Sequence, residues 1–180
     1  MRRFPFAVIV AFVASGCAAS LPYSADYPLT GLGFRSRDSV FAGKIPSGWI
    51  SSTEDSLANA LTAWLINEDY SAILAVKEIK LDKLTTKHVQ REGLKLLAQL
   101  HANLEGAGQS RGDFRDFEMQ GRRYSSYESS LGEASARVVV FAAKGRFYSC
   151  TAQTVRGTWS AANLAELFRV QQTLLASLVF

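Results

Sequence analysis

The stretch SARVVVFAAKGRFYSCTAQTV, residues 135–155, carries the clearest fold signal in this chain. Apolar and polar side chains alternate around Lys144-Gly145, as expected for two strands that each bury one face and meet at a two-residue turn. A turn of that length fixes the register between the strands. We therefore predict an antiparallel hairpin that aligns two pairs on one face of a sheet: Phe141 with Tyr148, and Val139 with Cys150.

Other segments have a similar strand-and-turn character. Residues 61–67 and 71–81 are apolar runs around a short polar turn, and residues 113–120 and 122–130 flank Gly121, so each pair predicts a hairpin. The stretch SVFAGKIPSGWISS (39–52) combines a short alternating run, a Pro-Ser-Gly turn and a second extended segment.

Two stretches instead have helical spacing. Residues 85–106 predict one helix that Gly106 ends, and residues 160–180 predict a second helix with Ser160 as its N-cap. The apolar face of the first contains Val89, Gly93, Leu96, Leu97, Leu100 and Leu104, and that of the second contains Leu164, Leu167, Phe168, Gln171, Leu174, Leu175 and Leu178. The order strands, helix, strands, helix predicts an α+β fold, an antiparallel sheet packed between or against α-helices.

The N-terminus has the order of a secretory signal: a positive start, an apolar stretch over residues 4–14 and then small residues. Ala14-Ser15-Gly16 followed by Cys17 resembles the bacterial lipobox, in which the cysteine is acylated after the signal is cut off. The resemblance implies a protein anchored to the lipid bilayer through acylated Cys17 in the bacterial cell envelope. By resemblance to enterobacterial lipoprotein sorting, Ala18 after the cysteine implies the outer membrane, facing the periplasm. The alternative is a plain secretory signal cut near Ala19, with Cys17 discarded.

These signals divide the 180 residues into three parts. We expect a lipoprotein signal peptide over 1–16, the lipidated cysteine and a tether over 17–38, and a single domain over 39–180. The tether is suggested by the prolines and glycines after Cys17 and by the weak periodicity. Cys150 is then the one cysteine left in the domain, so we expect no internal disulfide.

Three short segments together indicate a family resemblance: KIPSGW (44–49), VVVFAAKGRFYSCTAQ (138–153) and LFRVQQTLLASL (167–178). They resemble the PsbP-like superfamily, which includes the photosystem II extrinsic subunit, a Ran-binding nuclear import factor and bacterial lipoproteins of the DcrB type. The resemblance implies an α/β/α sandwich, with an antiparallel sheet between helices. It also implies a protein that docks to other macromolecules rather than a catalyst.

The reactive residues predict no catalytic or metal site. His88 and His101 lie too far around the first predicted helix to share one site, and Cys150 is on the apolar face of its hairpin. Nothing in the sequence has the spacing of a zinc site, a phosphate loop or another cofactor motif, so we expect no metal and no cofactor. The net charge of +4 is scattered along the chain, which argues against nucleic acid as a partner.

We therefore predict a non-catalytic, membrane-anchored module that binds a protein partner in the envelope. Arg122, Arg123, Tyr124 and Tyr127 are the candidate binding residues, because arginine and tyrosine are enriched at interfaces; ordinary strand residues are the alternative. The alternative function is a small-ligand carrier or sensor. A pocket between sheet and helix, lined by Trp and Tyr with a few convergent polar groups, would favour that function.

Overall fold

A computed structural model describes residues 21–55, 60–104, 113–131, 134–156 and 159–180. Cys17 and the predicted signal lie outside the described residues. The elements in chain order are β1 (Leu29–Arg35), β2 (Ala42–Pro46), β3 (Trp49–Ser51), β4 (Ala63–Asn67), β5 (Ala72–Ile79), α1 (Lys83–Glu92), α2 (Leu94–Leu104), β6 (Arg115–Met119), β7 (Arg122–Leu131), β8 (Ala134–Ala143), β9 (Arg146–Thr154) and α3 (Ala161–Ser177).

Seven of the strands form one antiparallel sheet with the order β3-β4-β5-β9-β8-β7-β6, while β1 and β2 pair separately. All three predicted hairpins are confirmed: β4–β5, β6–β7 and β8–β9. In the last of these, Phe141 lies opposite Tyr148 and Val139 opposite Cys150, as the two-residue turn requires. Strands β5 and β9 pair at the centre of the sheet, and this pair joins the strands before α1 to those after α2.

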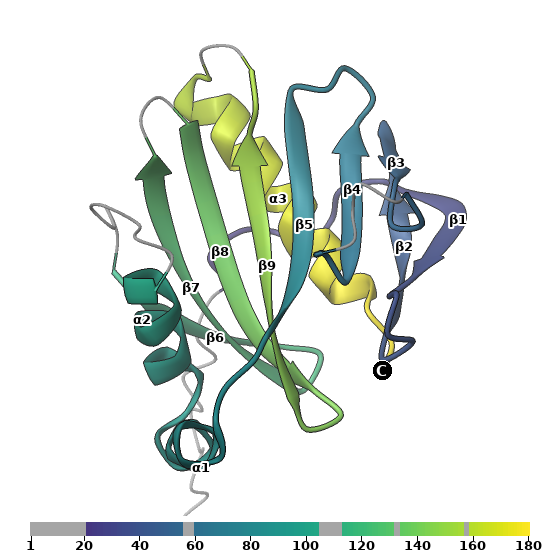
Figure 1. The fold of residues 1–180 in the computed structure, drawn as a ribbon. Helices are drawn as coiled ribbons and strands as arrows, with labels where there is room; N and C mark the ends of the chain where they lie inside the picture. The colour runs from purple at the N-terminus through teal and green to yellow at the C-terminus, as the bar shows by residue number, and fades with distance from the viewer. Residues whose placement is uncertain (1–20, 56–59, 105–112, 132–133, 157–158) are drawn as a thin grey trace, which may run out of the picture.

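Helices cover both faces of this sheet, so the predicted α+β class is confirmed (Figure 1). Helix α3 packs on one face in the larger apolar core, and the β1–β2 pair lies beside it. Helix α2 covers the other face over β7 and β8, and α1 packs against α2 and adds Val89 to the smaller core on this face. Ser160 caps α3 as predicted, because its side-chain oxygen accepts a hydrogen bond from the Asn163 amide.

The prediction of a single helix over residues 85–106 is wrong. The chain breaks at Gly93, whose φ of 96° lies outside the helical region, and two helices result. Val89 and Leu97 are buried as predicted, but Leu104 is 78% exposed. The break lets α2 face the sheet through residues that the continuous helix did not predict: Ala98, His101 and Ala102. Gly106, the predicted helix end, lies outside the described residues.

Residues 21–38, which the sequence assigned to a tether, pack against the domain instead. Strand β1 pairs with β2, and the rings of Tyr23 and Tyr27 contact the core beneath α3. The backbone N–H of Tyr27 donates a hydrogen bond to Thr173 Oγ1 at 3.0 Å. The folded part of the chain therefore begins well before residue 39. Among the described residues, no helix combines the length and the apolar character that membrane crossing demands.

Replacing Gly93 with Ala should lower the free energy of unfolding by about 1–3 kcal/mol, because an L-residue is strained at a positive φ with an extended ψ. Gly31→Ala is the matched control, since a Cβ there meets no atom within 4 Å. Urea unfolding followed by circular dichroism measures both. Equal stability of the two variants would argue against the break between α1 and α2.

Candidate functional site

The predicted binding residues on β7 do not form one surface. Successive strand residues point to opposite faces, so Tyr124 enters the core beneath α3 and Tyr127 enters the core beneath α2. Each tyrosine is only 2% exposed. The prediction that they contact a partner is therefore wrong. It failed because both faces of the sheet are covered.

The individual contacts of these residues are structural. Tyr124 stacks on Phe117 with ring centroids 5.2 Å apart, and the Tyr127 hydroxyl lies 2.8 Å from His101 Nδ1. Arg122 donates to the Leu178 carbonyl and lies over the ring of the C-terminal phenylalanine. Arg123 is exposed. Of the predicted set, only Arg123 is fully on the surface, while Arg122 is half-buried.

Cys150 is fully buried in the core beneath α3, as its place in the hairpin predicted. Burial raises the pKa of its thiol to about 12, so the thiol stays protonated at neutral pH. His101 is buried on α2 beside Tyr127, on the opposite face of the sheet, which rules out a pair between the two. Within the described ranges, no three His, Cys, Asp or Glu side chains come together as a metal site.

A polar cluster lies within the core between α3 and the sheet. Arg137 is 1% exposed, and its guanidinium donates to Gln171 Oε1 at 3.0 Å and to Gln172 Oε1 at 2.9 Å. Gln171 Nε2 in turn donates to the carbonyls of Arg137 and Cys150. The amide of Gln171 therefore joins α3 to the neighbouring strands β8 and β9. All the side chains of this cluster are buried, so a ligand in solvent cannot reach them. The cluster is therefore structural.

The feature suited to binding is a cleft of about 400 Å³ between α3, the strand pair β3–β4 and the N-terminal segment. Its apolar base comes from Leu167 and Val170. We call it the aromatic cleft, because three aromatic rings and three polar side chains form its walls. These residues are Tyr27, Trp49, Trp159, Asn67, Asn163 and Glu166.

Four separate parts of the chain build the aromatic cleft. Trp49 and Asn67 are partners in the β3–β4 register, and Trp159 directly precedes the N-cap of α3, where its indole N–H donates to the Arg156 carbonyl at 2.8 Å. Asn163 lies one helical turn after that cap. Tyr27 comes from the segment that the sequence assigned to a tether, so its place in the cleft could not be predicted.

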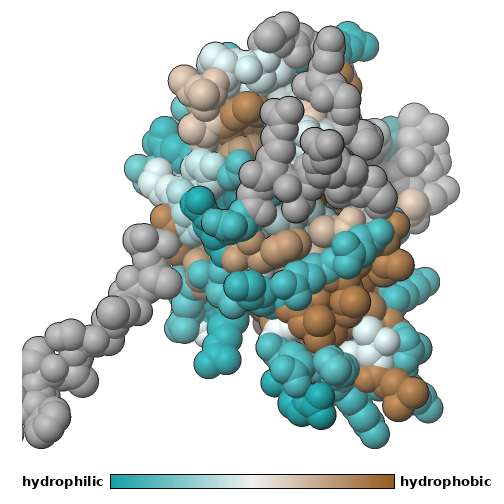
Figure 2. Space-filling model, turned by 90° about the vertical axis from the view of Figure 1, so that its left-hand side faces the viewer, coloured by the Kyte–Doolittle hydropathy of each residue, from teal (hydrophilic) through white to brown (hydrophobic). Residues whose placement is uncertain are grey.

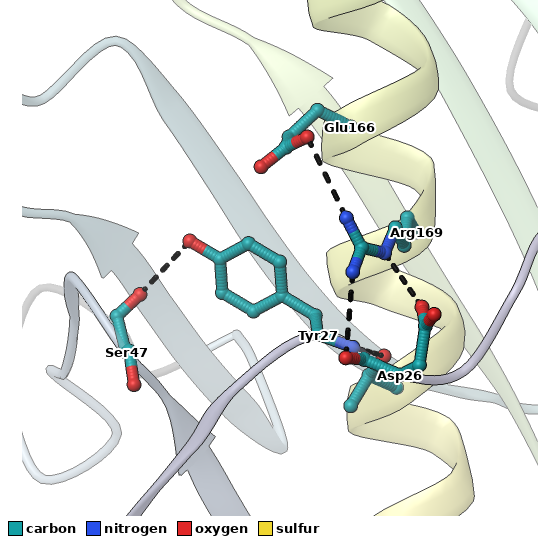
Figure 3. A network of polar contacts seen from close by, with 6 residues as sticks. Asp26, Tyr27, Ser47, Glu166 and Arg169 are labelled. Carbon is teal, nitrogen blue, oxygen red and sulfur yellow. Dashed lines mark hydrogen bonds and ion pairs between the residues drawn. The ribbon is translucent and has the colours of Figure 1, made fainter.

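A polar network holds Tyr27 in position (Figure 3). Its hydroxyl donates to the Ser47 carbonyl at 3.2 Å. The adjacent Asp26 accepts a hydrogen bond from Arg169 Nε at 2.6 Å, and Arg169 also lies 3.9 Å from the carboxylate of Glu166. Hydrogen bonds from Ser24 and Arg169 lower the pKa of Asp26, so this carboxylate is ionised at neutral pH.

A second hollow, of about 560 Å³, lies near the start of β4 and the end of β5. It is lined by charged side chains of both signs, among them Arg37, Asp38, Lys77 and Glu78. Arg37 is engaged there, because it donates to the backbone carbonyls of Thr53 and Asp55. Its lining contains no aromatic residue, and small-molecule sites are mostly apolar, so the aromatic cleft is the stronger candidate.

The sheet between helices places the chain in a known structural class, the PsbP-like fold. The solution structure of cyanobacterial PsbP (CyanoP) from Synechocystis sp. PCC 6803 matches with a TM-score of 0.52 and 12% identity, over 82% of this chain and 91% of that one. The Ran-binding protein Mog1p of Saccharomyces cerevisiae matches with a TM-score of 0.53 and 12% identity, over 84% and 95%. No family model and no curated protein sequence matches the chain. The likeness is therefore one of fold.

Replacing Gln171 with Leu should lower the free energy of unfolding by about 2–4 kcal/mol. The change keeps the side-chain volume but removes an acceptor from a buried guanidinium and a donor from two buried carbonyls. Gln99→Leu, at an exposed position on α2, is the matched control and should change stability by less than about 0.5 kcal/mol. Chemical denaturation compares them, and equal stability would show that the cluster contributes nothing.

Proposed function

We propose that this protein is a non-catalytic binding protein of the bacterial envelope that holds a small ligand in the aromatic cleft. The observation that carries the proposal is the cleft itself. Its volume of about 400 Å³ falls in the range of small-molecule sites, and three aromatic side chains share its lining with three polar ones. This is the arrangement that favours a carrier or sensor over a docking module.

A non-catalytic role is supported by where the reactive side chains lie. Cys150 and His101 are buried in different cores, out of reach of a substrate. Among the described residues that line the aromatic cleft, the one carboxyl is that of Glu166, which lies on an exposed turn of α3 beside Arg169. A carboxylate with no second acid, base or nucleophile in the same lining supports binding better than acid–base catalysis.

We also propose that acylated Cys17 anchors the domain to the outer membrane, facing the periplasm. The lipobox resemblance of residues 14–17 is the support for this anchor. Tyr27 is ten positions after Cys17, so the wall of the cleft can stand at most about 35 Å along the chain from the lipid. An anchored protein would therefore hold its cleft close to the bilayer surface.

Docking of a protein partner is a second candidate function. The apolar residues on the side that carries α1 and α2 favour it (Figure 2). Leu84 on α1 is 81% exposed and Leu104 on α2 is 78% exposed. Mog1p, which shares the fold, is a Ran-binding protein, and that adds an analogy of fold only.

Small-molecule fragments should bind in the aromatic cleft and shift the amide resonances of α3 and β3–β4 in NMR spectra of the protein. Trp159→Ala should abolish most of these shifts, because it removes one aromatic wall. Leu84→Ala, on the opposite layer, should leave them intact. Hits that gather on α1 and α2 and respond only to Leu84→Ala would favour protein docking instead.

Cys17→Ala should abolish incorporation of labelled palmitate and release the protein from the membrane fraction. Cys150→Ala is the matched control, since it removes the chain's other cysteine and should keep the label. Metabolic labelling followed by fractionation measures both. Palmitate uptake by Cys17→Ala equal to that of the wild type would rule out the anchor, and a soluble, unlabelled wild type would favour the plain secretory signal.

A further inference from the structure

We infer that the ligand of the aromatic cleft is a small organic cation that carries a quaternary or alkylated ammonium group. This inference rests on the proposed function and names its ligand class. The features that lead to it are the charges around the cleft, the aromatic side chains that line it and its size.

The charge balance favours a cation. Among the described residues that line the cleft, Glu166 is the one charged residue. The neighbouring Arg169 is held at 2.6 Å by Asp26, so two carboxylates face one guanidinium and these three groups together carry a net negative charge. An anionic ligand would meet the Glu166 carboxylate with like charge, while a cation would be attracted to it.

The aromatic lining favours the same class of ligand. The faces of Trp and Tyr rings carry negative electrostatic potential and bind ammonium groups, Trp most strongly. Two of the three rings here belong to tryptophans: Trp159 is partly exposed, while Trp49 is 5% exposed and lines the cleft from the core. The Tyr27 ring already has a cation near it, since Arg169 Cζ lies 5.9 Å from its centroid. An alkylated ammonium also has methyl groups that can pack on the apolar base at Leu167 and Val170.

The volume and the position of the cleft are compatible with such a cation. A volume of about 400 Å³ lies in the range of small-molecule sites and has room for an ammonium group with its alkyl substituents. Two sources supply such a group near a bilayer: a free solute amine, and the ammonium headgroup of a phospholipid. The short reach from Cys17 to Tyr27 brings the cleft close enough for either source.

The test compares choline with 3,3-dimethyl-1-butanol, which has the same shape but a carbon atom in place of the charged nitrogen. The full chain is kept in a maltoside detergent, which contains no ammonium group, and affinities are measured by calorimetry. Choline should bind at least about fivefold more tightly than the alcohol, because only choline has the charge. Equal affinities would overturn the inference.

Variants then assign the preference to the cleft. Glu166→Gln should weaken choline binding about three- to tenfold and leave the alcohol unchanged, since it removes a charge and keeps the shape. Glu118→Gln, exposed on the far edge strand β6, is the matched control. A choline preference that survives Glu166→Gln undiminished would contradict the assignment. Glu166 is exposed on α3, so this variant should fold normally.

Two further outcomes separate this inference from the proposed function. If Trp159→Ala abolishes the binding of neutral fragments while choline does not bind at all, the inferred ligand class is wrong and the proposed ligand site is supported. If no probe binds in a way that Trp159→Ala abolishes, both are wrong. Dihexanoylphosphatidylcholine, used below its micellar concentration, distinguishes the sources: affinity equal to or above that of choline indicates a lipid headgroup, and weaker affinity indicates a free amine, because its phosphate would face Glu166.

Discussion

The buried guanidinium of Arg137 is the constraint on which the packing of α3 depends. A charge removed from water must be matched by hydrogen bonds, and here two neutral amides, from Gln171 and Gln172, supply them at 3.0 and 2.9 Å. Burial lowers the pKa of Arg137 to about 10, which still leaves it charged at neutral pH. Sliding α3 by one residue would take both amides away from the guanidinium, so the cluster fixes where the helix lies along the sheet.

The same guanidinium also positions the N-terminal segment. The ring of Tyr23 covers it at 4.9 Å, and the Tyr23 hydroxyl donates to Glu128 on β7 at 2.9 Å. The segment then continues along α3 through the Asp26–Arg169 ion pair to Tyr27, which forms one wall of the aromatic cleft. The buried charge of Arg137 thus helps to position the segment that supplies the Tyr27 wall of the cleft.

The sequence predicted what local geometry determines. The Lys144-Gly145 turn fixed the register of β8 and β9, and Ser160 marked the start of α3, because both signals act within a few residues. The break at Gly93 escaped prediction, since the apolar spacing continues across it and only packing on the sheet selects two helices. Both tyrosines of β7 were misread for a related reason: strand alternation predicts that one is buried, and only the covered second face buries the other.

The aromatic cleft has no motif in the sequence, because its walls come from positions more than 130 residues apart, at Tyr27 and Trp159. Tyr27 was also hidden within a segment whose prolines indicated a tether. In the proposed anchored state that segment has two tasks, since it leads toward the lipid and forms part of the site. The ion pair of Asp26 and the bond from the Tyr27 amide to Thr173 lie between the anchor and the Tyr27 ring. In that proposed state, a pull from the lipid would meet these contacts to α3 before it reached the Tyr27 ring, and the wall of the cleft would stay in place.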